Sequence, residues 1–218
     1  MPGRYTSPDT CLGATPEDIA MGEDPFVSRH CLYDTAQLLP VFERMAAAAA
    51  DLLTAADSPL LVGVLRRGEP LAQLLAQRLA IKRGAPLPVL GLKLKRYADD
   101  LTVLHPETEL VASAEIAAFD FGGRTVLLVD DVLYQGHSLL RAVAYLAGRG
   151  CETIRTAVLV DRHIASMPIR ADIVGLTLEV AADDVIECHV PPYEPTLQID
   201  LCRRGSSQSQ DAMPQSNR

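Results

Sequence analysis

Short apolar segments alternate with helical patterns through most of this sequence. Segments of strand length, rich in valine, leucine and isoleucine, predict strands at residues 60–65, 89–96, 125–129, 154–160 and 173–180. Between them, apolar residues recur at intervals of three and four, which predicts amphipathic helices at residues 35–56, 70–82 and 139–149. Pro40 should divide or kink the first helix, and Gly150 suits the position just past the end of the third.

Strands and helices that alternate in this order predict an α/β fold, in which helices flank a central, mainly parallel sheet. Residues 26–202 hold all these segments and are expected to form one domain. Residues 1–25 lack periodicity and are expected to form a loose arm, and the polar residues 203–218 are expected to form a disordered tail.

The composition argues against several classes of protein. No apolar segment reaches membrane-spanning length and the first residues lack an apolar signal core, so we expect a cytoplasmic protein. The five cysteines are scattered without a Cys-x-x-Cys pair, and no His-Glu-x-x-His occurs, which excludes the common zinc motifs. A formal net charge of −8 and short basic clusters, such as residues 93–96, argue against RNA binding.

The residues that follow the segment 125–129 carry the most suggestive chemistry, because ligands of parallel sheets bind beyond the carboxyl ends of the strands. Asp130 and Asp131 repel each other, a cost that is easier to explain if they bind hydroxyls or a cation. Residues 135–138, Gln-Gly-His-Ser, then open a helix, whose free N–H groups and dipole favour a phosphate. Together these parts suit a phosphorylated sugar, whereas an isolated acid pair is more often a solvated turn or a cap.

Residues 126–138, Val-Leu-Leu-Val-Asp-Asp-Val-Leu-Tyr-Gln-Gly-His-Ser, closely resemble the signature with which type I phosphoribosyltransferases bind 5-phosphoribosyl-1-diphosphate (PRPP). The resemblance implies that Asp130 and Asp131 bind the ribose hydroxyls, directly or through Mg²⁺ and water. It also implies a loop around the 5′-phosphate, formed by Tyr134, Gln135, Gly136, His137 and Ser138. For His137, a plain role as a helix-start residue is the alternative.

Three further segments resemble one branch of that family, the pyrimidine-operon regulator/uracil phosphoribosyltransferases, and the likeness spans about residues 35–180. Residues 62–68, Val-Gly-Val-Leu-Arg-Arg-Gly, are similar to its diphosphate loop. Residues 96–100 are similar to its flexible hood, and residues 159–162 with 168–175 to its base-side segment. The implied contacts are Arg66, Arg67 and Gly68 for the diphosphate, Arg96, Tyr97, Asp99 and Asp100 for the hood, and Asp161, Arg162, Ile173 and Val174 for the base.

The resemblance implies transfer of the phosphoribosyl group from PRPP to a nucleobase, with uracil favoured, and release of diphosphate. Asp130, Asp131 and Arg67 are the implied catalytic residues, Mg²⁺ the implied cofactor and a homo-oligomer the implied assembly. Plain alternatives remain: a solvated turn for the arginine pair, a polar loop for the hood acids, and an internal salt bridge between Asp161 and Arg162.

Three departures from the family pattern favour an alternative function. Ala98 stands where the branch has an arginine in the hood, and Gln135 stands where the phosphate loop has threonine or serine. Ile173 stands where an aromatic residue often stacks on the base. Lost contacts beside a retained PRPP signature predict a catalytically weak or inactive PRPP-binding regulator of nucleotide metabolism. The sequence names neither the base nor the pathway.

Overall fold

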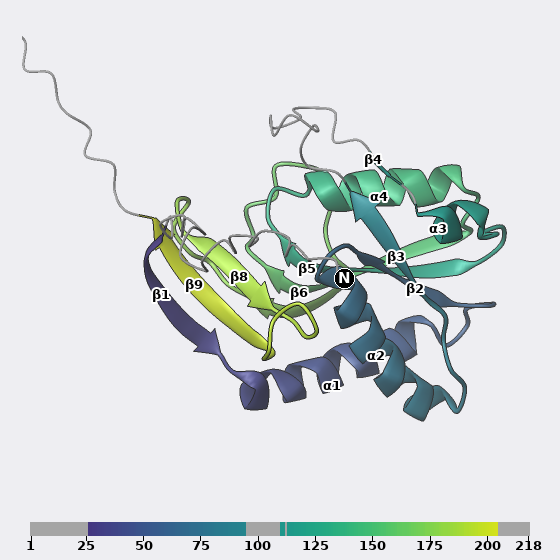
Figure 1. The fold of residues 1–218 in the computed structure, drawn as a ribbon. Helices are drawn as coiled ribbons and strands as arrows, with labels where there is room; N and C mark the ends of the chain where they lie inside the picture. Colours follow the sequence, from purple (N-terminus) through teal and green to yellow (C-terminus); the bar gives the residue numbers. More distant parts are fainter. Residues whose placement is uncertain (1–25, 95–109, 112, 205–218) are drawn as a thin grey trace, which may run out of the picture.

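The computed structural model describes residues 26–94, 110–111 and 113–204 (Figure 1). The predicted arm at residues 1–25 lies outside the described residues, as do the hood residues Arg96, Tyr97, Asp99 and Asp100. The predicted tail begins too early, because Arg203 and Arg204 close a strand. Its remainder, residues 205–218, also lies outside the described part.

The large sheet confirms the predicted α/β fold. Its strand order is β4-β3-β2-β5-β6-β7, and every neighbouring pair is parallel except β3 with β4. Strands β2 and β5 lie at its centre, where both faces are covered, and their residues are almost all buried. The bounds are β2 Leu60–Val64, β3 Val89–Leu94, β4 Leu110–Val111, β5 Thr125–Leu133, β6 Thr153–Asp161 and β7 Ile173–Thr177.

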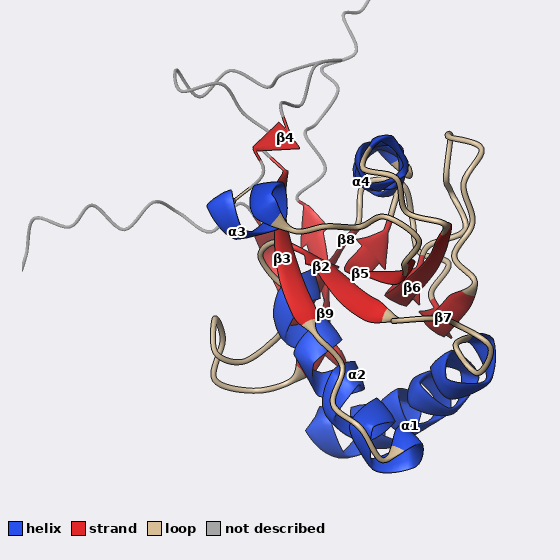
Figure 2. Cartoon of the chain, turned by 90° about the vertical axis from the view of Figure 1, so that its right-hand side faces the viewer, coloured by secondary structure: helices blue, strands red, loops and turns tan. Residues whose placement is uncertain are grey.

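Helices cover both faces of this sheet (Figure 2). Helices α1 (Thr35–Leu52) and α2 (Gly68–Arg83) pack on one face, and α3 (Ala114–Ala118) and α4 (His137–Gly148) lie on the other. Successive residues of the buried strands alternate between two apolar clusters, one on each face of the sheet. These layers hold the carboxyl ends of the parallel strands in fixed positions.

Helix α1 begins with a capping box and runs through its proline. The Asp34 carboxylate accepts a hydrogen bond from the Gln37 N–H, and the Gln37 side chain accepts one from the Asp34 N–H. The helix is not divided at Pro40, contrary to one of the two expectations. The apolar side chains on both sides of Pro40, including Leu38 and Phe42, are buried in the core, and this burial outweighs one missing hydrogen bond.

A second sheet, which the sequence patterns did not predict, stands at the end of the large sheet where β5 and β6 finish (Figure 1). It is antiparallel, in the order β1-β9-β8, and consists of Phe26–Tyr33, Gln198–Arg204 and Val185–His189. Ile186 and Cys188 point from it into the core that α1 and α2 share. None of the helices in the described ranges is long and apolar enough to cross a membrane.

Candidate active site

A step in the large sheet creates the site. The ladder between β2 and β5 ends at the pair Gly63 and Val129, whereas the ladder between β5 and β6 continues to Leu133 and Asp161. The predicted strand end at residue 129 is therefore wrong, because β5 carries the acid pair within its regular hydrogen bonding to β6. On the β2 side, Asp130 and Asp131 stand past the last paired residues and border the space beyond the end of that ladder.

A cavity of about 1110 Å³ occupies this space, between the ends of the parallel strands and the small sheet. The chain brings together residues from six separate segments: the end of β2 with the β2–α2 loop, β3, the end of β5 with the residue after it, the residue after β6, the turn before β8 with β8 itself, and the β8–β9 loop. The wall is formed by Val64, Leu65, Arg66, Arg67, Lys93, Asp130, Asp131, Val132, Tyr134, Arg162, Ala182, Asp183, Asp184, Val185, Ile186, Glu187 and Tyr193.

The two central carboxylates are held by the backbone. One oxygen of Asp130 accepts a hydrogen bond from the Asp131 N–H at 2.9 Å, and one oxygen of Asp131 accepts one from the Val132 N–H at 2.9 Å. Asp130 is buried and Asp131 is half-buried, and both line the cavity. Fixed, partly desolvated carboxylates beside a cavity suit hydroxyl groups or a hydrated cation as partners.

The β2–α2 loop brings two arginines to the same cavity. Arg66 and Arg67 line the cavity, and the peptide bond between Leu65 and Arg66 is cis. Helix α2 begins at Gly68, two residues earlier than predicted, and no side chain caps its first turn. A Cβ atom on Gly68 would lie 2.5 Å from the Val129 carbonyl oxygen, so only glycine lets this helix start approach β5 so closely.

Arg67 forms an ion pair with Glu194 of the β8–β9 loop, through Nε at 3.2 Å and Nη2 at 2.7 Å. Burial alone would raise the pKa of Glu194, but hydrogen bonds from Arg67 and from the Val190 N–H outweigh it, and the pKa is lowered. Burial likewise acts to lower the pKa of Arg67, while Glu194 and the charge of Asp131 raise it. Both groups are therefore charged at neutral pH.

The predicted phosphate loop lies between β5 and α4. Of its residues Tyr134 lines the cavity, whereas Gln135, Gly136, His137 and Ser138 do not. Gly136 has φ of 89° and precedes α4, which begins at His137 without a side-chain cap. The first N–H groups of α4 thus remain for an anion at the edge of the cavity.

Arg162 also lines the cavity, together with Tyr134. Its side chain is 4% exposed, stacks on the Tyr134 ring at 4.7 Å and donates to the Ala181 carbonyl at 3.0 Å. Within the described residues its Nε atom is buried without a hydrogen-bond partner. Asp161 does not line the cavity and accepts a hydrogen bond from the His163 N–H at 2.8 Å. The polar partner found for Arg162 is thus a carbonyl rather than Asp161.

The structure does not bring Ile173 and Val174 to the cavity, which corrects their assignment to the base. In the ladder Val174 is level with Val158, and Val158 with Asp130, so Val174 lies two strands away from the acid pair. Ile173 is buried in the core cluster of α1 and α2, and Val174 faces outward on β7. Strand alternation therefore directs neither side chain to the cavity.

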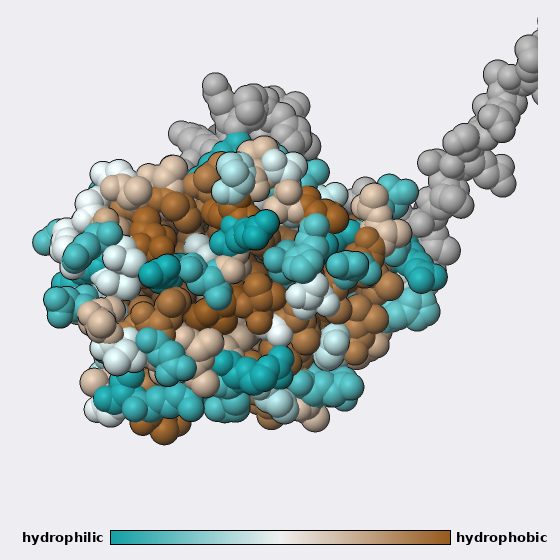
Figure 3. Space-filling view, turned by 180° about the vertical axis from the view of Figure 1, so that it is seen from behind, coloured by the Kyte–Doolittle hydropathy of each residue, from teal (hydrophilic) through white to brown (hydrophobic). Residues whose placement is uncertain are grey.

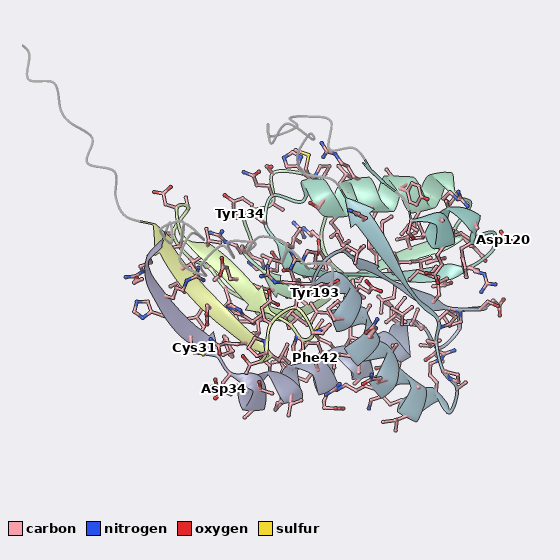
Figure 4. All side chains as sticks on the ribbon, viewed as in Figure 1. Cys31, Asp34, Phe42, Asp120, Tyr134 and Tyr193 are labelled. Atoms are coloured by element: carbon pink, nitrogen blue, oxygen red, sulfur yellow. The ribbon has the colours of Figure 1, made fainter. Side chains whose placement is uncertain are left out.

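Sequence reasoning missed part of the wall. Tyr193 belongs to the loop after β8, and Asp183, Asp184 and Glu187 come from the turn before β8 and from β8 itself. Figure 4 shows Tyr193 and Tyr134 at the end of the large sheet nearest the small sheet. The alternation of apolar and polar residues in Val185–His189 is the one local signal that could have indicated this strand.

A magnesium ion fits the donors at this site only together with a ligand. No cluster of three or more metal-binding side chains occurs among the described residues, but Asp130 and Asp131 offer two carboxylates on one wall. Mg²⁺ usually keeps several waters and binds through one or two carboxylates plus substrate phosphates. Asp130 and Asp131 would hold the ion directly or through water.

The comparisons with known proteins agree with this geometry. The profile of the phosphoribosyl transferase domain matches residues 32–195. A protein named bifunctional protein PyrR from Actinobacillus pleuropneumoniae is 31% identical over 173 residues, 79% of this chain and 96% of the relative. Another PyrR, from Deinococcus deserti, is 37% identical over 147 residues, 67% of this chain and 79% of the relative. These relatives confirm the predicted resemblance to the pyrimidine-operon regulator/uracil phosphoribosyltransferase branch.

Solved structures support the fold. A hypoxanthine phosphoribosyltransferase of Trypanosoma cruzi superposes with a TM-score of 0.66 and 19% identity, over 84% of this chain and 94% of the other. One from Staphylococcus aureus gives a TM-score of 0.60 and 15% identity, over 74% of this chain and 82% of the other.

Proposed function

The chain belongs to the phosphoribosyl transferase domain family, and on this premise we propose that it transfers the phosphoribosyl group of PRPP to a nucleobase and releases diphosphate. One observation carries the proposal. One cavity is lined both by two carboxylates, those of Asp130 and Asp131, and by two guanidinium groups, those of Arg66 and Arg67. PRPP presents hydroxyl groups and a diphosphate on one ribose, and this pattern of charges matches both.

In the proposed complex, Asp130 and Asp131 bind the ribose hydroxyls. Arg66, Arg67 and the Gly68 N–H bind the diphosphate, and the start of α4 binds the 5′-phosphate. The bond between C1 of the ribose and the diphosphate oxygen breaks, and diphosphate leaves with the electron pair. A base nitrogen forms the new bond to C1 and gives up its proton to water. When bound, Mg²⁺ neutralises charge on the leaving diphosphate.

The base would lie near Arg162 and Tyr134, which both line the cavity. Arg162 lines the cavity and carries N–H donors, which suit a carbonyl oxygen on the base. Uracil carries such oxygens, and so do hypoxanthine and guanine, so our proposal of a pyrimidine rests on the likeness to the PyrR relatives.

A second function, binding of PRPP without efficient transfer, is favoured by the sequence around Ala98. This residue lies outside the described residues and replaces an arginine of the family pattern. If that loss limits the reaction, Ala98→Arg should raise turnover about tenfold, as expected for one restored charge-assisted contact.

A transfer assay with radiolabelled bases decides between these functions. The native chain is mixed with PRPP, Mg²⁺ and uracil, cytosine, hypoxanthine or guanine, and nucleotide products are separated on an anion-exchange filter. Product from uracil supports the proposal, product from a purine moves the proposal to that base, and saturable PRPP binding without product supports the regulator.

We also propose that the chain forms a homo-oligomer. Seen from behind, the molecule shows apolar surface gathered across the middle of one face (Figure 3), and large exposed side chains include Ile81, Ile164 and Val174. Light scattering of the purified chain tests the assembly, and a monomer at micromolar concentration would contradict it.

A further inference from the structure

The loop between β8 and β9 reaches across the cavity mouth and contacts both arginines of the β2–α2 loop. Tyr193 contacts Arg66, and Glu194 contacts Arg67. Arg67 and Glu194 lie 127 residues apart in the sequence. Two neighbouring side chains of one loop thus contact two neighbouring side chains of another, next to the wall where the proposed function places the diphosphate.

The Glu194 carboxylate is fixed at both oxygens. Oε1 accepts hydrogen bonds from Nε and Nη2 of Arg67, and Oε2 accepts one from the Val190 N–H at 2.8 Å. Its side chain is 17% exposed. Within the described residues, Nη1 of Arg67 takes part in no hydrogen bond. Glu194 therefore orients the guanidinium through one side and leaves Nη1 for an anion in the cavity.

Tyr193 holds Arg66 in a different way. The guanidinium carbon of Arg66 lies 4.9 Å from the centre of the Tyr193 ring. A cation–π contact consumes none of the five N–H groups of an arginine, because the aromatic ring attracts the charge as a whole. Arg66 is thus restrained and remains able to donate hydrogen bonds to phosphate oxygens.

We propose that Tyr193 and Glu194 are positioning residues that hold Arg66 and Arg67 ready for the diphosphate of PRPP. This inference rests on the proposed function. Arginine side chains have many rotamers, and a ligand that must order two of them loses affinity. The loop supplies that order before the ligand arrives. Diphosphate can bind Nη1 of Arg67 without displacing Glu194, because Glu194 accepts only from Nε and Nη2.

Calorimetric titration with diphosphate in the presence of Mg²⁺ tests the proposal, with ribose 5-phosphate as the second probe. Glu194→Gln removes the charge and should weaken diphosphate binding about tenfold. Tyr193→Leu should weaken it about threefold, and Tyr193→Phe, which keeps the ring, should restore native affinity. Affinity for ribose 5-phosphate should be unchanged in all three variants, because this probe lacks the diphosphate. General damage to the site would lower both affinities and overturn the proposal.

Glu43→Gln is the matched control, since it breaks another glutamate–arginine pair, Glu43 with Arg78, on the surface outside the cavity wall. Tighter diphosphate binding by Glu194→Gln would show that Glu194 competes with the ligand, and this would overturn the proposal. Should that variant not fold, the comparison of Tyr193→Leu with Tyr193→Phe decides. If the native chain binds PRPP and the variants at Tyr193 and Glu194 bind it equally well, this inference alone is refuted. If the native chain binds neither diphosphate nor ribose 5-phosphate, the proposed function is refuted as well.

Discussion

At the scale of single residues, substitution of the acid pair should weaken ligand binding and leave the fold intact. Asp130 and Asp131 each use one oxygen to accept a backbone N–H, and asparagine can do the same with its amide oxygen. The double substitution Asp130→Asn, Asp131→Asn should therefore keep the fold. It should weaken PRPP binding by about 100-fold or more, because two charge-assisted hydrogen bonds are lost. Calorimetry measures the affinity, and a urea melt checks the fold.

Asp120→Asn is the control for this pair. Asp120 likewise accepts a backbone N–H, from Gly122, and Figure 4 shows it at the far end of the large sheet. PRPP affinity should be native in this variant. Native affinity in the Asp130, Asp131 variant too would show that the ribose binds elsewhere.

Gly68 is a second residue for which the structure predicts the effect of a substitution on stability. In Gly68→Ala the new methyl group would lie 2.5 Å from the Val129 carbonyl oxygen, so the start of α2 must move away from β5. We expect the free energy of unfolding to fall by about 1–3 kcal/mol, as for other overpacked sites. Urea denaturation measures this, and PRPP affinity should fall as well, because Arg67 and the Gly68 N–H move with the helix.

Gly148→Ala gives the matched comparison. Gly148 is also helical, at the end of α4, and nothing lies within 4 Å of a Cβ atom placed on it. This substitution should raise the free energy of unfolding by about 0.5 kcal/mol, because alanine favours helix. Equal effects of the two substitutions would mean that the close approach at Gly68 does not constrain the fold.

Residues of the site differ in how far the sequence could reveal them. Asp130 and Asp131 lie in the last part of β5, and Arg66 and Arg67 follow shortly after β2, so the rule on carboxyl ends of parallel strands located them. Glu194 could not be found in this way, because its contact with Arg67 joins segments 127 residues apart. Local patterns carry no information on such a pair.

At the scale of elements, the parallel strands could be predicted from the sequence because both of their faces are buried. Strands β2 and β5 are nearly continuous apolar segments, and the pattern predicted them within four residues at each end. The strands of the small sheet are short, and polar residues interrupt their apolar ones, Glu187 in β8 and the buried Asp200 in β9. Short strands of this kind gain much of their stability from pairing with distant segments, so a single sequence indicates them only weakly.

The small sheet also sets the reactivity of its cysteines. Burial, then the charge of Asp131, raises the pKa of Cys188 well above its usual value. Burial and the charge of Glu187 raise that of Cys202 to about 11. Both thiols should stay protonated and unreactive at pH 8, since the thiolate forms only as the pH rises past the pKa. Cys31 on β1 is exposed and should react.

Mass spectrometry after brief iodoacetamide labelling tests this order. Native protein should carry the label on Cys31 well before Cys188 or Cys202, and urea should make all three react alike. Fast labelling of Cys188 in native protein would show that the small sheet opens readily, which contradicts its place in the core.

At the scale of the whole molecule, the first and last described strands form one pair. β1 and β9 are antiparallel neighbours, and Leu32 and Tyr33 of β1 pack against the core cluster below α1 and α2. The β8–β9 loop that contacts the arginines of the site is anchored at its far end by β9. Destabilisation of the small sheet should therefore weaken diphosphate binding, although no residue of β1 lines the cavity.

Two truncations test this architecture. Removal of residues 1–25 and 205–218, which flank the strands and lack core-forming periodicity, should shift the thermal midpoint by less than about 3 °C. Extending the first deletion through β1, to residue 33, should lower the midpoint by about 8 °C or more, because β9 loses its partner and becomes an unpaired edge. Calorimetry measures both. A large fall in the shorter deletion would mean that a terminal segment packs on the core, and equal midpoints would mean that β1 contributes little. PRPP affinity should follow the same order, because the loop that carries Tyr193 and Glu194 depends on the small sheet.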